Sequence, residues 1–246
     1  MARGGSAGPS EGGPSAALPK YVQISEMLIR DIAAGRLADG TRLPPEREMA
    51  EALGTAVGTL RKALENLAKK GLIERVHGSG NYVRARTDVA SVYAMLRLER
   101  IGGGGLPTAA LLSVERRPKP ADAPAFGADA QGWRFRRLRF LDDRPAALEE
   151  IWLDGARAAH IDPTEVSESL YLFYRERLGL IIMSATDQVN LAPVPGWGDA
   201  RFAMPAGATA GYVERIGRDP GGQAIEFSRT WFDPSEVVYI SRLGKG

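Results

Sequence analysis

Apolar side chains recur every three or four residues in three N-terminal segments, which predicts three amphipathic helices. The first covers residues 20–36 and has one apolar face: Tyr21, Ile24, Leu28 and Ile32. A short second helix follows Pro45 and ends at Gly54. The third covers residues 58–70 and turns four apolar side chains inward: Leu60, Ala63, Leu64 and Leu67. Three such helices in close succession indicate a small helical domain.

Two short strands are predicted directly after the third helix. They cover residues 72–76 and 81–85 and flank His77-Gly78-Ser79-Gly80, a sequence that suits a hairpin turn. Helix, helix, turn, helix and hairpin in this order outline a winged helix-turn-helix. We place this N-terminal domain at residues 19–86.

Beyond this domain the pattern changes to alternating strands separated by turn residues. We expect strands over residues 92–98, 110–115, 133–141, 147–153, 181–191, 211–219, 224–232 and 237–243, and one helix over 169–178. The predicted fold class is α+β, with a winged helix-turn-helix followed by a mainly antiparallel sheet. The C-terminal domain is placed at residues 87–246, with a polar linker at about 84–92. Residues 1–18 are rich in Gly, Ser, Pro and Ala, so we expect a disordered tail.

Composition excludes several kinds of site. The 246 residues include no cysteine and two histidines, so thiolate metal sites, iron–sulfur clusters and a three-histidine metal centre are excluded. We therefore expect no metal and no cofactor. No run reaches the 18 apolar residues of a membrane span, and no signal peptide opens the chain. The absence of cysteine also fits a reducing, cytosolic compartment, and we expect no membrane partner.

The net charge of +2 hides an uneven distribution. Residues 19–86 hold 12 Lys or Arg against 8 Asp or Glu, whereas residues 87–246 hold 19 against 21. A positive excess on the helix-turn-helix is the charge expected for neutralising DNA phosphates. An ordinary solvated surface explains the same asymmetry, so charge alone leaves both interpretations open.

Three motifs in the N-terminal domain belong together. They are the helix start LPPERE at residues 43–48, the run TLRKAL at residues 59–64 and the turn GSG at residues 78–80. With their spacing, residues 43–83 closely resemble the GntR family of bacterial transcription regulators. The resemblance implies the bacterial cytoplasm, at the nucleoid, as the location and double-stranded operator DNA as a partner. It also implies these DNA-binding residues: Arg47, Ala56, Val57, Gly58, Thr59, Arg61, His77 and Gly78.

The residue types suit these roles. Arg47 lies in the first turn of the second helix, where a guanidinium and backbone amides suit a phosphate, although pairing with a neighbouring Glu is the alternative. Arg61 could hold a guanine or a phosphate, or be a solvated surface residue. His77 and Gly78 form the wing tip, where a small backbone fits against the sugar–phosphate wall; a tight hairpin alone also explains the glycine.

One segment departs from the family pattern. Many relatives have Val-Ser-Arg or Val-Thr-Arg before the Thr-Leu-Arg run, whereas this chain has Thr55, Ala56, Val57 and Gly58. Small apolar groups replace a hydroxyl and a guanidinium, so we expect a different operator, with a thymine methyl against Ala56 or Val57. Selection of binding sites that returned the common family motif unchanged would contradict this expectation.

The C-terminal domain carries a second ordered set of motifs. They are RLR at residues 137–139, PAALE at 145–149, SLY at 169–171 and IEFSRTWF at 225–232. This order resembles the UTRA domain of the HutC-type branch, a chorismate-lyase-like fold that binds small molecules. The strand-rich pattern and scarce histidine exclude the branch with a helical, histidine-centred effector domain, and the length excludes a fused pyridoxal-phosphate enzyme.

The UTRA resemblance implies a set of effector-binding residues. Arg137, Arg139, Ser169 and Tyr171 would hold an acidic group, and Glu149 and Glu226 would lie opposite and bind hydroxyls. Phe232-Asp233-Pro234 stands where relatives often have Tyr-Arg-x-Asp. The loss of a phenol and an arginine beside Phe232 predicts a ligand that is smaller or less polar than a phosphosugar.

Strand geometry supports an anion site without the family. Arg137 and Arg139 are two residues apart on a predicted strand, so both face one side of the sheet, where paired guanidiniums suit a phosphate or carboxylate. Arg134 and Arg136 are expected to point to the other side, toward solvent. The alternative pairs the first two arginines with Glu149 and Glu150 on a neighbouring strand, with no ligand.

These observations predict a ligand-responsive transcription regulator, a repressor that binds DNA as a homodimer at half-sites one helical turn apart. We expect no enzyme activity and no catalytic residue, because Ser169 lacks a histidine base and the carboxylate pairs are sequence neighbours on opposite strand faces. Two alternatives stay open: a constitutive dimeric DNA-binding protein without a ligand, and a chorismate-lyase-like enzyme.

Overall fold

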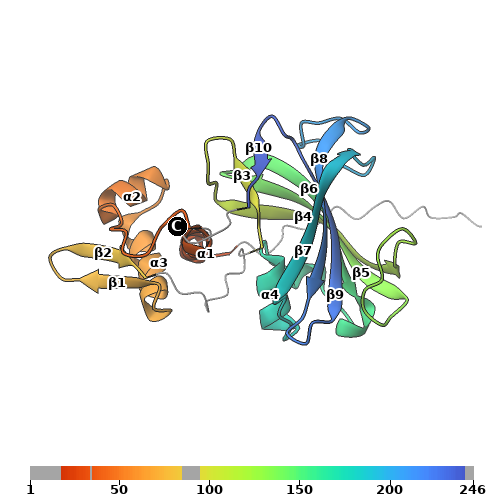
Figure 1. The fold of residues 1–246 in the computed structure, drawn as a ribbon, viewed down its shortest axis with the longest axis horizontal. Helices are drawn as coiled ribbons and strands as arrows, with labels where there is room; N and C mark the ends of the chain where they lie inside the picture. The colour runs from red at the N-terminus through yellow and green to blue at the C-terminus, as the bar shows by residue number, and fades with distance from the viewer. Residues whose placement is uncertain (1–17, 34, 85–94, 242–246) are drawn as a thin grey trace, which may run out of the picture.

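The computed structural model describes residues 18–33, 35–84 and 95–241. The expected tail and linker lie outside these ranges, except for Leu18 and Arg84. Parts of three predicted strands also lie outside them (residue 85, residues 92–94 and residues 242–243). The described chain forms a smaller N-terminal domain and a larger C-terminal sheet domain (Figure 1).

The N-terminal domain is a winged helix-turn-helix, as the periodicity predicts. Its elements are α1 (Lys20–Ala33), α2 (Glu46–Ala52), α3 (Val57–Lys69) and the antiparallel hairpin β1 (Ile73–Val76) and β2 (Gly80–Val83). Helix α3 is central, because Leu60, Leu64 and Leu67 are fully buried in the core that it shares with α1. Burying each such side chain stabilises the fold by about 1.5–3 kcal/mol. Helix α2 and the hairpin lie on the side turned away from the sheet domain (Figure 1).

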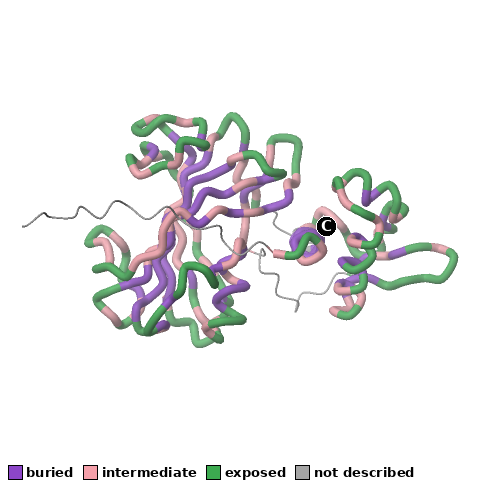
Figure 2. Tube along the Cα trace, turned by 180° about the vertical axis from the view of Figure 1, so that it is seen from behind, coloured by how far each residue is buried: buried purple, intermediate pink, exposed green. Residues whose placement is uncertain are grey.

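The C-terminal domain is built on one six-stranded antiparallel sheet, which confirms the α+β prediction. Its strand order is β4-β5-β6-β9-β8-β7. The strands are β4 (Pro107–Pro118), β5 (Gln131–Leu141), β6 (Arg144–Asp154), β7 (Ser184–Pro193), β8 (Thr209–Arg218) and β9 (Ala224–Phe232). Buried residues follow the strands through the middle of this domain (Figure 2).

Different elements cover the two faces of this sheet. Helix α4 (Leu170–Arg177) packs on one face through Phe173 and Tyr174, against Phe135 and Ile151. On the same face, β3 (Leu98–Arg100) and β10 (Val237–Tyr239) form a separate two-stranded sheet. The loop between β7 and β8 covers part of the opposite face. The space between α4, the small sheet and the large sheet is where the candidate ligand site lies.

Helix α1 also contacts the C-terminal domain. Gln23 Nε2 donates a hydrogen bond to Glu168 Oε2 (3.0 Å), and Arg30 Nη2 donates to the carbonyl oxygen of Gly105 (3.0 Å). Leu106, from the start of the sheet domain, is buried in the hydrophobic core of the N-terminal domain. The two domains therefore meet through side chains that are largely buried.

Several element boundaries differ from the predictions. Helix α1 ends three residues before Arg36, and residues 95–97 and 181–183 are not strand. Strand β10 ends at Tyr239, and β4 is twice as long as the predicted segment 110–115. Local alternation marks the strand centres, but pairing with a long neighbour decides where a strand ends.

Candidate functional site

The predicted DNA-binding side chains gather on the outer surface of the N-terminal domain. Arg47 lies in the first turn of α2, exposed, with no ion pair in the described part of the chain. Ala56 is the N-cap residue of α3 and is exposed, as is Gly58; Thr59 is half-buried in the first turn. The start of α3 thus presents backbone and small side chains.

Arg61 is exposed on the next turn of α3 and is paired across the helix-turn-helix. Its Nε donates to Oε2 of Glu46 at 2.6 Å. The hydrogen bond and the charge of Glu46 raise the pKa of Arg61, so it is a permanent cation. The sequence suggested either a DNA contact or a solvated surface residue for Arg61, and neither interpretation included an ion pair with Glu46.

Val57 lies differently from the expectation. It is the first residue of α3, it is half-buried, and it packs against the core of the N-terminal domain. Positions 57, 60, 64 and 67 follow the three- and four-residue steps of one helix face, so Val57 continues the buried stripe. Ala56, and not Val57, is therefore the apolar side chain that faces outward.

The wing tip is built as expected. His77 and Gly78 are exposed between β1 and β2, and Gly78 has φ +71°, a conformation that favours glycine. The Ser79 and Tyr82 hydroxyls are hydrogen-bonded at 2.7 Å, which fixes the hairpin. Both properties of Gly78, a tight turn and a small outward surface, are present together.

The structure adds two basic residues that the sequence did not single out. Arg42 and Arg75 are exposed and line a groove between the start of α2 and the wing, together with His77. Arg75 Nη2 also donates to the backbone oxygen of Arg61, at 3.4 Å. Basic residues in a turn and a strand carry no pattern of their own, so only the fold brings them to this surface.

The candidate ligand site is a cavity on the α4 face of the large sheet. Cross-strand register explains its floor: Arg137, Glu149, Thr230 and Val213 form one row across β5, β6, β9 and β8. Ile151, Ser228 and Arg215 form the next row. Ser169 and Tyr171 come from α4 and its N-cap, and residues 95–98 and Tyr239 come from the β3–β10 side.

Two arginines clamp one carboxylate in this cavity. Arg137 donates to Glu149 Oε2 from Nε (3.0 Å) and Nη2 (2.6 Å), and Arg139 donates from Nε to Oε1 (3.1 Å). All three side chains are buried. Burial raises the pKa of Glu149, but the charges of Arg137 and Arg139 outweigh burial and lower it to about 2. The UTRA resemblance implied that Glu149 lies opposite the arginines. The structure instead places Glu149 beside them, in direct contact with both.

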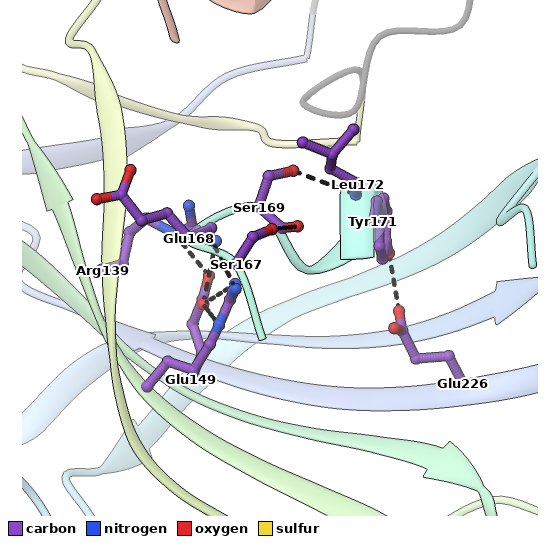
Figure 3. A network of polar contacts seen from close by, with 9 residues as sticks. Arg139, Glu149, Ser167, Glu168, Ser169, Tyr171, Leu172 and Glu226 are labelled. Atoms are coloured by element: carbon purple, nitrogen blue, oxygen red, sulfur yellow. Dashed lines mark hydrogen bonds and ion pairs between the residues drawn. The ribbon is translucent and has the colours of Figure 1, made fainter. Parts of the chain in front are cut away.

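The segment before α4 is tied to the same cluster. Arg137 Nη1 donates to the carbonyl oxygen of Glu168 at 3.2 Å, and the Ser169 side chain caps α4 by accepting from the Leu172 amide (Figure 3). Burial raises the pKa of the Glu168 carboxyl. Arg137 thus contacts both the sheet and the segment that leads into α4.

Glu226 lies at the other end of the cavity. Tyr171 donates its hydroxyl proton to Glu226 Oε1 at 2.8 Å (Figure 3). Glu226 is fully buried and its Oε2 makes no hydrogen bond to the described residues. Burial raises the pKa of Glu226 above its ordinary value, so its proton is held more tightly than that of Glu149.

A third charged group in the cavity was missed by the sequence analysis. Arg215 donates from Nε and Nη2 to the two carboxylate oxygens of Asp187, both at 2.6 Å, and Tyr239 donates to Asp187 Oδ2 at 2.7 Å. Burial lowers the pKa of Arg215, but the hydrogen bond and charge of Asp187, together with the charges of Tyr171 and Glu226, outweigh burial and raise the pKa above its ordinary value. Alternation along β7 and β8 places Asp187 and Arg215 on the same face of the sheet. Only the pairing of β8 with β9 shows that this is the face that also carries Arg137.

Three predicted positions need correction. Phe232 does not line the cavity; its ring packs in a core cluster with Ala147 and lies over Gly211. Arg134 and Arg136 do face the other side of β5, but they are not solvated. Arg136 donates to Glu150 Oε2 (2.9 Å) and lies over the Trp197 ring.

The part of the chain that the structure describes contains no cluster of His, Asp or Glu suited to a metal ion. Likewise, none of its helices combines the length and the apolar composition needed to cross a membrane.

Comparisons with known proteins account for both domains. Residues 20–83 match the model of the bacterial regulatory proteins of the gntR family, and residues 103–237 match the UTRA domain. The HTH-type transcriptional regulator SmoD of Agrobacterium fabrum is 54% identical over 226 residues, which cover 92% of this chain and 97% of SmoD. The chain belongs to the GntR family. It is a transcriptional regulator with a UTRA effector domain.

More distant members of the GntR family agree in length and fold. The repressor NagR of Bacillus subtilis is 28% identical over 93% of this chain and 96% of NagR. The ligand-binding domain of a putative GntR-family regulator from Bordetella bronchiseptica superposes with a TM-score of 0.54 at 21% identity, over 61% of this chain and 97% of that domain. The possible regulator YydK of Bacillus subtilis gives a TM-score of 0.52 at 20% identity, over 92% of this chain and all of YydK.

Proposed function

We propose that this regulator is a repressor whose operator binding is controlled by a small anionic metabolite in the C-terminal cavity. The observation that carries the proposal is the charge of the lining: four arginines line the cavity, against two carboxylates in the lining and a third, Asp187, behind Arg215. The arginines are Arg97, Arg137, Arg139 and Arg215, and the carboxylates are Glu149 and Glu226. The raised pKa of Glu226 shifts the balance further toward positive charge.

The rest of the lining suits a polar ligand. Hydroxyl groups of Ser169, Tyr171, Ser228 and Thr230 surround the arginines, and such groups orient a ligand that carries hydroxyls. The N-terminus of α4 at Ser169 adds a partial positive charge. A small hydroxylated carboxylate, phosphate or sulfonate fits this chemistry.

Contacts from the cavity to α1 offer a route for control. Arg137 bonds to the backbone of Glu168, and the Glu168 side chain accepts from Gln23 of α1. A ligand that competes for Arg137 therefore acts on a segment that holds the DNA-binding domain in place. This route adds to the linker at residues 84–92, of which only Arg84 belongs to the described residues.

The ligand proposal is tested with paired arginine variants. A thermal-shift screen of small anionic metabolites identifies a ligand, and Arg137→Ala combined with Arg139→Ala should abolish its stabilising effect and its effect on operator binding. Operator affinity without ligand should stay within a few-fold. Arg136→Ala, on the opposite face of the same strand, is the control and should keep the response. Loss of ligand response and of operator binding together would contradict separate roles.

We propose that the regulator is a homodimer that pairs through β7. This strand is one of the two end strands of the six-stranded sheet, the other being β4, and no other described strand pairs with its outer edge. Val189 and Leu191 on β7 are 53% and 66% exposed. A long edge strand with exposed apolar side chains favours pairing with another strand, and a second copy related by a two-fold axis suits a near-palindromic operator.

Sedimentation velocity tests the dimer. Val189→Lys with Leu191→Lys should shift the protein to monomer and weaken operator binding, because one monomer contacts only one half-site. Ile101→Lys changes an apolar side chain of similar exposure (56%) outside β7 and should stay dimeric. An unchanged sedimentation coefficient in the β7 variant would place the interface elsewhere.

The two alternative functions have clear outcomes. A screen in which no anionic metabolite stabilises the protein favours a constitutive DNA-binding dimer. Turnover of chorismate by the full chain favours a lyase. Tyr171 and Glu226 are then the acid–base candidates, because the arginine clamp holds Glu149 and not Glu226.

A further inference from the structure

The start of the recognition helix offers few groups that can read a base. Ala56, Val57 and Gly58 carry no hydrogen-bonding side chain, and Val57 is turned into the core. Thr59 is half-buried, and the exposed Lys62 carries a single ammonium group, so Arg61 is the exposed guanidinium in the first two turns of α3 that can bind guanine in a fork. The placement of this one guanidinium therefore matters more here than in a helix with several base-reading residues.

Glu46 holds that guanidinium from one side. The Arg61 side chain is 62% exposed and that of Glu46 is 27% exposed, and their contact runs from Nε to Oε2 at 2.6 Å. The bond uses Nε and leaves both terminal nitrogens of Arg61 without a partner among the described residues. Those two nitrogens form the edge that donates to O6 and N7 of guanine.

We propose that Glu46 is a positioning residue for sequence reading: its carboxylate fixes Arg61 so that the terminal nitrogens face a guanine. A free arginine has about 2 kcal/mol of rotamer entropy to lose on binding. An arginine already held by a carboxylate loses less rotamer entropy when it binds a base. The same restraint gives no advantage in binding a phosphate, which the arginine can reach in many orientations. Glu46 therefore increases discrimination between sequences and not overall affinity.

The charge of Glu46 makes this proposal separable from a simple electrostatic role. A carboxylate beside DNA phosphates weakens binding to every sequence, so its removal should strengthen non-specific binding. Loss of positioning should at the same time weaken discrimination at the guanine. Removal of Glu46 should therefore strengthen non-specific binding and weaken discrimination at the guanine. A merely structural role of Glu46 would not produce these two effects together.

The experiment uses the full chain and an operator selected from randomised duplexes. Dissociation constants are measured for the operator, for the operator with each guanine replaced in turn, and for unrelated DNA. Glu46→Ala should reduce discrimination at one guanine about tenfold, the size of one bidentate base contact, while affinity for unrelated DNA rises. Glu46→Gln, which keeps an acceptor oxygen, should retain part of the discrimination.

Glu48→Ala is the matched control. Glu48 is an exposed carboxylate on the same turn of α2, with no ion pair to the described residues. Its removal should raise affinity for all DNA and leave discrimination unchanged. If Glu46→Ala and Glu48→Ala give the same ratio of specific to non-specific affinity, the proposal is wrong.

An Arg61→Lys background separates positioning from direct contact. Lysine lacks the guanidinium fork, so Glu46→Ala should cause no further loss of discrimination in that background. A further loss would mean that Glu46 itself contacts a base, which would overturn the proposal.

The inference rests on DNA binding by the winged helix. Failure of the selection to enrich any sequence would contradict DNA recognition itself, whereas a selected operator with unaltered discrimination contradicts the role of Glu46 alone.

Discussion

The clamp around Glu149 shows how much a single buried carboxylate depends on its neighbours. Two arginines hold its pKa at about 2, whereas its ordinary value is 4.5. A carboxylate whose pKa is lower in the folded state stabilises the protein above its unfolded pKa, and this stabilisation disappears as the pH falls through the folded pKa. The clamp should therefore contribute fully above pH 5 and lose its effect between about pH 4.5 and 2.

Glu149→Gln tests this clamp. At pH 6 the variant should be less stable than the parent by about 3 kcal/mol, because two buried guanidiniums lose their counter-charge. The difference should shrink as the pH falls below 4.5. Urea unfolding at pH 6, 4 and 3 measures it, with the exposed Glu236→Gln as the control. A difference that stayed constant over this range would show that Glu149 is not held ionised by the arginines.

For single residues, the sequence predicted which face of the sheet a charged side chain lies on better than it predicted the ion-pair partner of that side chain. Alternation alone correctly put Arg137 and Arg139 on one face and Arg136 on the other. The alternative that paired Arg137 and Arg139 with Glu149 and Glu150 is right for Glu149, which binds both arginines, and wrong for Glu150, which binds Arg136. Alternation cannot choose among these partners, because strand register depends on turn lengths and bulges that local sequence does not specify. Arg215 was missed for the same reason, since its row joins the β8–β9 hairpin to β6, a strand that lies far earlier in the chain.

Strand β8 contains an example of packing that sequence patterns do not show. A Cβ atom at Gly211 would lie 2.3–2.7 Å from three ring atoms of Phe232. Phe232, expected to be a ligand contact, therefore uses the space that Gly211 leaves. The aromatic motif was recognised correctly, but whether its last ring faces a cavity or a glycine depends on the opposite strand.

Gly211→Ala should destabilise the protein by about 1–3 kcal/mol, because the new methyl group forces the Phe232 ring out of its site. The free energy of unfolding from urea titration measures the effect. Gly196→Ala is the control, since a Cβ atom there meets no atom within 4 Å. Equal stability of the Gly211 variant and the parent would mean that the ring has a second position open to it.

Over the whole molecule, the sequence predicted two domains but not how they touch. Each domain has its own periodicity, and these patterns gave the winged helix and the antiparallel sheet. The hydrogen bond from Gln23 to Glu168 joins positions 145 residues apart, and neither residue belongs to a motif. Contacts between domains depend on how the complete domains pack together, so no local sequence pattern predicts them.

Gln23→Ala tests whether this contact carries the ligand effect. The ratio of operator affinities with and without a ligand found by screening should fall toward one, from the 5- to 150-fold typical of coupled sites. Ligand affinity of the DNA-free protein should change by no more than a few-fold. Gln131→Ala, at an exposed position on β5, should keep the full ratio. A full ratio in the Gln23 variant would assign the coupling to other contacts.

Leu106 has a consequence for engineering regulators from this chain. It is buried in the core of the winged helix, although it precedes the first strand of the large sheet. A chimaera cut in the linker and fused to a foreign sensor would leave a hole in that core and would remove the Gly105 carbonyl oxygen that accepts from Arg30 Nη2. A transplantable DNA-binding module should therefore bring a leucine and its preceding glycine from the recipient side of the junction.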